Sequence, residues 1–382
     1  MLKINLYQMR IPFKFSFGHG AAKRTTSDSF ILKLESEEGL IGYGEGLPRS
    51  YVTGETLDTS CQFFKESLSP LIKTSSFQFK SNNNLQEILE NIHNCFFKNI
   101  NFQKEDNVSF NSIKCATEMA LLDLVLQKEK KDLNNLIPPN NKVNYSCILP
   151  FFPLKYLGLI LRFLKFYKFK QIKVKTNAQD DEQRLKKIRE ILGNEVEIRI
   201  DGNSIYDRDS FTKNMPIFKK HNVSWIEQPF HKNKHDEIVS HFSQRDIPLM
   251  ADESLCTLKD GEHIINNKTF DLFNLRISKN GGLKDSLALF EMAKKAGLGY
   301  QVGAQVGETA LLSCLGRSFA YYINPIAVEG SAGNLLLKKD ISVENIRFKK
   351  GGLAEVLKDK SHFGVTINSN IIEKYGNLAF EL

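Results

Sequence analysis

The sequence predicts an α/β fold in which a closed parallel barrel of the (β/α)8 kind follows an α+β domain of roughly 140 residues. Three observations predict it. Strands come before helices in the first third of the chain, short aliphatic strands alternate with helices in the rest, and charged residues end consecutive strands at an even spacing. An open doubly wound sheet is the competing fold, but no G-x-G-x-x-G motif follows the first strand to favour it.

The first 140 residues carry a hairpin and then helices. The stretches "SFILKLES" and "LIGYGEG" flank the turn "EEG" at 37–39, which is typical of two antiparallel strands. Apolar residues then recur at helical spacing over 82–99 and 112–130. Because strands and helices are segregated, this part predicts an α+β domain.

From residue 141 the pattern changes to alternating strands and helices. Helical stretches such as 181–193 and 284–297 each end on a glycine at the C-cap position. Eight strands with helical crossovers over roughly 200 residues fit a closed parallel barrel. The expected strands cover 143–149, 171–175, 196–201, 223–228, 247–253, 272–279, 298–305 and 326–330.

The spacing of charged residues is the stronger observation. The charged residues at the ends of five consecutive strands are 26, 26, 25 and 27 residues apart: Lys175, Asp201, Glu227, Asp252 and Lys279. Each therefore follows the last by one β/α unit. The carboxyl ends of barrel strands converge on one mouth, so we expect these five groups to face a single cavity.

Strand parity supports that placement. In "IKVK" the side chains of Lys173 and Lys175 share one face of the strand, and Arg199 and Asp201 share one face of the next. The aliphatic face can then pack against the surrounding helices while the charged face points into the barrel.

Three carboxylates, Asp201, Glu227 and Asp252, come without a histidine or cysteine at neighbouring strand ends. Hard oxygen ligands suit Mg²⁺, with Mn²⁺ as a substitute. The alternative is a structural network in which the carboxylates only neutralise the lysines.

Lys175 and Lys279 lie four strands apart, on opposite sides of an eight-stranded barrel. One lysine can remove the proton α to a substrate carboxylate and the other can return a proton to the opposite face. A useful base titrates near pH ~7–8 rather than ~10.4. A nearby dication and Lys173 both disfavour the protonated form, so Lys173 is expected to lower the proton affinity of Lys175 and to contact the substrate carboxylate.

Composition excludes several other classes of protein. The net charge is +8, but lysines are scattered and the densest basic stretches, 161–171 and 127–131, are short, so no nucleic-acid partner is expected. No apolar run is long enough to cross a membrane and residues 1–13 lack a signal pattern. Six cysteines without paired spacing indicate a reduced, cytoplasmic protein.

The motifs "KVK" at 173–175, "DGN" at 201–203, "WIEQP" at 225–229, "ADES" at 251–254 and "KNGG" at 279–282 together resemble the enolase superfamily. The resemblance is to its branch of muconate lactonizing enzymes, dipeptide epimerases, N-acylamino acid racemases and o-succinylbenzoate synthases. It implies a (β/α)8-type (β7α-modified) TIM barrel over 141–354 and an α+β N-terminal capping domain over 1–140, completed by 355–382.

The resemblance also implies roles. Asp201, Glu227 and Asp252 would bind the metal, while Lys175 and Lys279 would be the acid/base catalysts and Lys173 the first lysine of their pair. Asn203, Glu253, Glu308 and Glu329 would lie beside the ligands or bind substrate.

One departure concerns the substrate. Dipeptide epimerases carry an Asp-x-Asp near the eighth strand that binds the substrate's amino group, whereas this chain reads "AVEGSAGN" with Glu329 as a single acid. In the capping loop 17–27, His19, Lys23 and Arg24 can meet a second anionic group, or the loop is plain surface.

We therefore expect an isomerase that abstracts the proton α to the carboxylate of a small-molecule substrate, in a homo-oligomer. Racemisation or epimerisation of an N-substituted amino acid or dipeptide is favoured because both faces carry a lysine. Cycloisomerisation of the muconate lactonizing type and dehydration of the o-succinylbenzoate synthase type remain open. A Schiff-base aldolase and a catalytically silent barrel are more remote.

Overall fold

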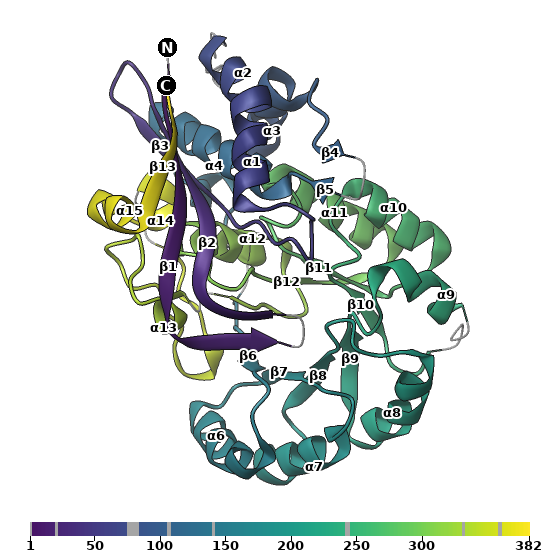
Figure 1. Ribbon diagram of the computed structural model, residues 1–382. Coiled ribbons are helices and arrows are strands. Elements are labelled where there is room, and N and C mark those ends of the chain that lie inside the picture. The colour runs from purple at the N-terminus through teal and green to yellow at the C-terminus, as the bar shows by residue number, and fades with distance from the viewer. Residues whose placement is uncertain are drawn as a thin grey trace.

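The computed structural model describes residues 2–19, 22–74, 84–104, 108–139, 142–240, 245–330, 333–357 and 361–382. A four-stranded antiparallel sheet stands beside a curled parallel sheet (Figure 1). The antiparallel sheet has the order β13-β1-β2-β3, with bounds β1 Lys3–His19, β2 Ala22–Glu35, β3 Ile41–Gly46 and β13 Gly376–Glu381. The predicted hairpin is the β2–β3 pair, in which Glu35 lies opposite Ile41.

The last strand of the chain completes this N-terminal sheet. β13 pairs antiparallel with β1, and the amide of Ile4 donates to the carbonyl of Leu382 at 2.8 Å. The two ends of the chain therefore lie side by side (Figure 1).

The helix α4 (Asn111–Lys128) packs directly on β3, and glycines make this possible. A Cβ added at Gly42, Gly44 or Gly46 would lie within 2.2 Å of a backbone oxygen of α4. These glycines alternate along the strand and therefore share the face that meets the helix. The sequence "IGYGEG" thus permits a helix-to-strand approach that side chains would block.

The remaining elements of this part are short. The helix predicted over 82–99 is α3 followed by a π-helical turn, His93–Phe97, and a similar turn, Phe64–Leu68, joins α1 to α2. The bounds are α1 Leu57–Phe63, α2 Ser69–Thr74, α3 Leu85–Ile92, β4 Gln103–Lys104, β5 Val108–Ser109 and α5 Leu133–Leu136.

Seven parallel strands form the second sheet, in the order β12-β11-β10-β9-β8-β7-β6. Each strand is the sequence neighbour of the next, as a series of β/α units requires. Their bounds are β6 Cys147–Leu149, β7 Gln171–Lys175, β8 Glu197–Asp201, β9 Val223–Glu227, β10 Leu249–Ala251, β11 Leu272–Leu275 and β12 Gly299–Val302.

The eighth strand predicted at 326–330 is reduced to single bridges. Val328 forms parallel bridges with Val302, at the end of β12, and with Tyr145, just before β6. Pro325 lacks an N–H group and Gly330 has φ +118°, so the segment extends for only a few residues. The two edges of the seven-stranded sheet are nevertheless joined through this segment.

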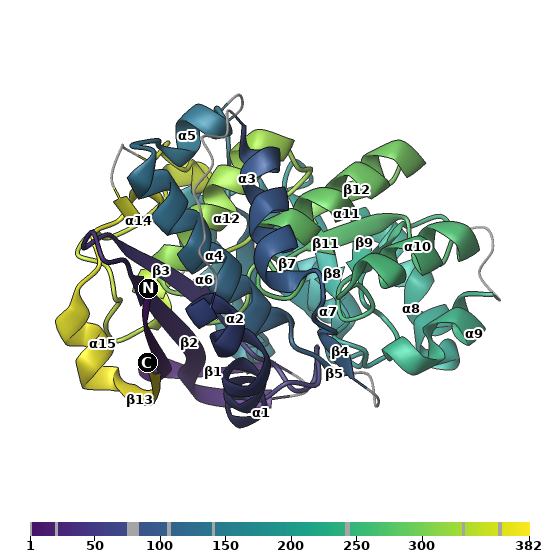
Figure 2. The same cartoon turned by 90° about the horizontal axis from the view of Figure 1, so that it is seen from above.

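Helices cover the outer face of the parallel sheet (Figures 1 and 2). They are α6 Leu154–Tyr167, α7 Asp181–Leu192, α8 Arg208–Lys220, α9 His235–Val239, α10 Leu258–Asn267, α11 Leu283–Ala296 and α12 Ala310–Ile323. Later in the chain, α13 Gly333–Leu336 and α15 Ser369–Tyr375 contact β1, and α14 Ser361–Gly364 contacts α4 and α12. Two 3₁₀ turns, Lys232–Lys234 and Lys350–Gly352, complete the described structure. Within the described ranges, no helix is long and apolar enough to cross a membrane.

Buried polar contacts tie the N-terminal part to the barrel. The carboxylate of Glu45, on β3, accepts from the backbone N–H of Thr309 at 2.9 Å and from that of Leu312 at 3.2 Å, at the start of α12. The amide of Asn111 donates to the carbonyls of Lys279 at 2.6 Å and Cys256 at 2.9 Å. The first contact caps a barrel helix, and the second holds two loops at the carboxyl end of the sheet.

Candidate active site

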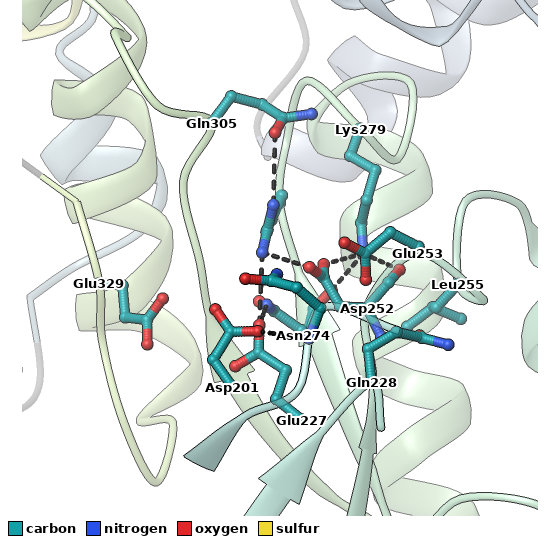
Figure 3. Close-up of polar contacts among 12 residues, drawn as sticks. Asp201, Glu227, Gln228, Asp252, Glu253, Leu255, Asn274, Lys279, Gln305 and Glu329 are labelled. Atoms are coloured by element: carbon teal, nitrogen blue, oxygen red, sulfur yellow. Dashed lines mark hydrogen bonds and ion pairs between the residues drawn. The ribbon is translucent and has the colours of Figure 1, made fainter. Parts of the chain in front are cut away.

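Three carboxylates lie together at the carboxyl ends of β8, β9 and β10 (Figure 3). Asp201 and Glu227 are the last residues of their strands and are paired in register, and Asp252 follows β10 directly. All three side chains are buried. Adjacent parallel strands that end at the same level bring about this clustering, as the 25–26-residue spacing predicts.

Glu227 is the central carboxylate. Asn274 donates to its Oε1 at 2.9 Å and Gln301 to its Oε2 at 3.2 Å. Burial raises the pKa of Glu227 to about 7, the charge of Lys173 acts in the opposite direction, and Asp201 raises the pKa further. The amides therefore orient a carboxylate whose negative charge needs a nearby cation.

Lys173 lies among the carboxylates and supplies such a cation. Its Nζ is 2.7 Å from Glu329, 3.3 Å from Glu227 and 3.4 Å from Asp201. Burial lowers the pKa of Lys173, but attraction by Glu227, Glu329 and Asp201 outweighs burial and raises that pKa well above its usual range. Lys173 is therefore a fixed positive charge two residues from Lys175, on the same strand face.

Lys175 and Lys279 lie at opposite ends of the carboxylate row. Nζ of Lys175 contacts Asp201 at 3.1 Å and Oδ1 of Asn203 at 2.6 Å. Nζ of Lys279 donates to Oδ1 of Asp252 at 3.1 Å and to its backbone carbonyl at 2.7 Å. Both lysines are buried, and each reaches a different end of the cluster.

The "KNGG" turn explains how Lys279 is held. Oδ1 of Asn280 accepts from the N–H of Arg276 at 2.8 Å, and the Asn280 amide donates to the carbonyl of Leu255 at 2.9 Å. Gly281 and Gly282 have φ of +86° and +119°, which side chains rarely adopt. A Cβ at Gly282 would lie 2.4 Å from Glu118 of α4, so this turn is built around the N-terminal part.

Glu329 lies at the reduced eighth strand and belongs to the same cluster. Its Oε1 accepts from Arg199 at 2.6 Å and its Oε2 from Lys173 at 2.7 Å. Burial raises the pKa of Glu329, but the charges of Lys173 and Arg199 outweigh burial and hold that pKa below its usual value. Both carboxylate oxygens are thus engaged by internal cations.

Glu253 and Glu308 stand outside the direct contacts of the carboxylate row. Burial and the charge of Asp252 raise the pKa of Glu253 to about 8, and its Oε2 is buried without a hydrogen-bond partner. Glu308 accepts from the N–H of Gln305 at 2.6 Å, and burial raises its pKa to about 8. The structure places both acids near the site but joins neither to the three carboxylates.

Arg276 is the residue of the cluster that the strand-end spacing did not reveal. Its Nη2 contacts Glu227 at 3.3 Å and also bonds Asp252, and its Nη1 donates to Gln305 at 3.3 Å. The available signal was parity, because Arg276 shares a strand face with Asn274 in "LFNLRISK". Arg199 was likewise recognisable only as the face partner of Asp201.

The donor set suits a hard divalent cation. Three carboxylates from adjacent strands, with Glu227 held by two amides, match the oxygen ligands of Mg²⁺. As the side chains lie, however, no group of three His, Cys, Asp or Glu residues in the described ranges has the spacing of a metal site. Arg276 bridges Glu227 and Asp252, so a cation that bound both would have to displace its guanidinium.

The capping loop is only partly described. The side chains at 17–23 lie outside the described residues, so the predicted roles of His19 and Lys23 have no structural counterpart here. Arg24 lies over the ring of Tyr51 at 5.6 Å and 3.7 Å from Asp28.

Comparison with known proteins gives a family match over more than half of the chain. Residues 159–371 match the family model described as "Enolase C-terminal domain-like". The chain is 28% identical to the N-succinyl-L-Arg/Lys racemase of Bacillus cereus, over 97% of this chain and 96% of that protein. It is 24% identical to the o-succinylbenzoate synthase of Listeria innocua, over 95% and 92% of the two chains.

Solved structures agree over the whole length. The N-succinyl Arg/Lys racemase from Bacillus cereus superposes with a TM-score of 0.84 at 26% identity, covering 100% of this chain and 98% of that one. A dipeptide epimerase from Cytophaga hutchinsonii, complexed with Mg and the dipeptide D-Ala-L-Val, superposes with a TM-score of 0.80 at 22% identity and the same coverage. The fold is therefore TIM-barrel-like with an added N-terminal sheet.

Proposed function

The chain belongs to the enolase superfamily, and from this premise we propose that it is a Mg²⁺-dependent racemase or epimerase that acts on an N-substituted amino acid. Relatives named as racemases and epimerases place it among isomerases, with o-succinylbenzoate synthase as a related activity. The reaction exchanges the proton α to a substrate carboxylate.

The observation that carries the proposal is the pair of lysines at the two ends of the carboxylate row. Lys175 contacts Asp201 at one end, and Lys279 contacts Asp252 at the other. A substrate carboxylate drawn to the middle of the row would place its α-carbon between two amines. Two acid/base groups on opposite faces are what inversion of a stereocentre requires.

The side chains then divide the work. The neutral lysine takes the α-proton, and the protonated lysine on the other face returns one, so running the reaction backwards exchanges their roles. Asp201, Glu227 and Asp252 would hold Mg²⁺, which when bound would offset the negative charge that develops on the substrate carboxylate. Lys173, held protonated by its carboxylates, supplies a further fixed positive charge for that carboxylate.

The contacts of Glu329 favour a substrate whose amino group is blocked. Binding a free ammonium group requires an accepting carboxylate, and both oxygens of Glu329 already accept from Arg199 and Lys173. An N-acyl or N-succinyl amino acid has no ammonium group at that position. We therefore favour N-acylated amino acids over dipeptides with a free amino terminus.

The proposal also covers the metal, the domain organisation, the location and the oligomeric state. Mn²⁺ would substitute for Mg²⁺ because it accepts the same oxygen ligands. We propose a capping domain at 1–140, completed by 355–382 through β13, and a barrel at 141–354. The six cysteines are free, which supports a cytoplasmic location, and we propose a homo-oligomer.

Solvent exchange tests the reaction. Each enantiomer of a panel of N-succinyl and N-acyl amino acids is incubated in D₂O with Mg²⁺ and followed by proton NMR. The wild-type enzyme should introduce deuterium at the α-carbon of both enantiomers. Lys175→Ala should lose exchange from one enantiomer and Lys279→Ala from the other, whereas Lys219→Ala, at the exposed surface of α8, should change neither.

Several results would redirect the proposal. If both variants lose exchange only because they no longer bind Mg²⁺, the two-base reading is wrong. Loss of water from a substrate without α-deuteration of the recovered starting material would favour the dehydratase. Equal turnover of free dipeptides and their N-succinyl analogues would contradict the argument from Glu329.

A further inference from the structure

The barrel helix α6 (Leu154–Tyr167) presents an apolar stripe to solvent. Tyr156, Leu159, Phe163 and Phe166 are 53%, 73%, 59% and 69% exposed. Their spacing of three, four and three residues puts them on one side of the helix. Leu159 and Phe166 are the two most exposed large hydrophobic residues of the described chain.

The side of α6 that packs on the barrel faces away from most of this stripe, although the ring of Phe166 also lies 4.5 Å from Nζ of Lys350. The opposite side of α6 buries Leu157, Leu161 and Leu164 against the barrel, and Gly158 lets the helix approach Lys187 of α7. The stripe lies outside these contacts, and Phe151 and Tyr167 extend it with 42% and 38% of their surfaces exposed. Large contiguous apolar surfaces of this kind mark interaction sites rather than ordinary solvent-facing helices.

The charged residues beside the stripe limit the kinds of partner that can bind it. Residues 133–179 contain no Asp or Glu. On α6 itself Lys155, Arg162 and Lys165 project from one edge of the stripe, as their helical positions require. The surface is thus an apolar seam with cations along one margin.

We propose that this stripe is an interface between two copies of the chain, packed α6 against α6. The repeat of three and four residues at 156, 159, 163 and 166 is the seam that two helices use to interlock. The location also allows it, because α6 lies at the far side of the barrel from α1–α4 (Figure 1). Two barrels could meet there without covering the N-terminal sheet.

The exposed area is large enough for a stable pair. An aromatic side chain buries about 150–250 Å², so the exposed fractions of the six residues amount to roughly 600 Å² per chain. Two copies would bury roughly 1,200 Å², which reaches the lower bound of specific interfaces. The cations would remain at the rim, where water and salt screen their mutual repulsion.

Sedimentation tests the interface on the full-length protein. The wild-type chain should form a dimer at micromolar concentration, and Leu159→Lys with Phe163→Lys should weaken self-association by about 100-fold or more. Val343→Lys serves as the control, because Val343 is also exposed, at 66%, but lies on another surface. Far-UV circular dichroism should be unchanged in all three proteins, since Leu159 and Phe163 lie away from the buried side of α6. The thermal midpoint of the double variant should be lower than that of the wild type only by the stabilisation that dimer formation provides.

Added salt and lipid vesicles distinguish self-association from binding to an anionic membrane surface. Added NaCl should strengthen the dimer, because it screens like charges beside an apolar seam. The proposal is overturned if the wild-type chain stays monomeric at high micromolar concentration or if the double variant dimerises as tightly as the wild type. It is equally overturned if the monomer binds phosphatidylglycerol vesicles and salt releases it, which would assign the stripe to an anionic membrane surface.

Discussion

Replacing Arg276 with methionine tests how the carboxylate cluster is balanced. The substitution keeps most of the apolar stem and removes the guanidinium that bridges the buried Glu227 and Asp252. Removing one partner of a buried ion pair costs about 3–5 kcal/mol, because the other charge is left uncompensated. Without metal, we expect Arg276→Met to lower the free energy of unfolding by this amount.

Mg²⁺ should reverse part of the loss. The wild-type enzyme must give up the Arg276 contacts before a cation can bind both carboxylates, whereas the variant has no guanidinium to displace and keeps only the lysine contacts. Its affinity for Mg²⁺ should rise at least tenfold, which corresponds to about 1.4 kcal/mol. A ligand at about 100 times its dissociation constant stabilises the folded state by ~2.7 kcal/mol.

The assay is denaturant unfolding in EDTA and in saturating MgCl₂, with calorimetric titration of Mg²⁺. Arg199→Met is the matched control, because it also removes a buried guanidinium from the barrel. Arg199 pairs with Glu329 rather than with Glu227 or Asp252. Its loss of stability should be similar with and without Mg²⁺. The reasoning is refuted if Arg276→Met binds Mg²⁺ no more tightly than the wild type and shows the same deficit in both buffers.

Two further perturbations test the fold. Gly44→Ala should destabilise the protein by about 3 kcal/mol or more in denaturant unfolding, because its Cβ would lie 1.8 Å from the carbonyl oxygen of Ala116. The control is Gly316→Ala, inside α12, which should be neutral or stabilising because a Cβ there would meet open space. Burial lowers the pKa of His235 to about 4, so the unfolded chain takes up a proton near pH ~6.5 before the folded one does. The free energy of unfolding should therefore fall by up to about 3 kcal/mol as the pH falls from ~6.5 towards ~4. His235→Asn should flatten this part of the plot of unfolding free energy against pH, and an unchanged slope would exclude His235 as its source.

Local pattern was sufficient for much of the site. A strand alternates its side chains regardless of its surroundings, so Lys173 and Lys175 had to share a face. An even spacing of about one β/α unit had to bring Asp201, Glu227 and Asp252 to one end of a parallel sheet. The structure places these residues together for those two reasons, and both can be predicted from the sequence.

The pairing of charges could not be predicted from the sequence in this way. Arg276 pairs with Glu227 and Asp252, and Arg199 and Lys173 both pair with Glu329, so that each pairing joins residues of different strands. Such pairings depend on side-chain rotamers and on which buried charge lacks a partner, and no periodicity encodes them. The eighth strand was also overestimated, because Pro325 and Gly330 limit it to isolated bridges.

Spacing along the chain is enough to predict the order of the elements, the faces of the strands and the charged groups at the barrel mouth. Which cations contact which carboxylates depends instead on the tertiary structure. It also decided which side of α6 stays uncovered. The physical reason is that burial and charge compensation are properties of neighbours in space, and those neighbours come from every part of the chain.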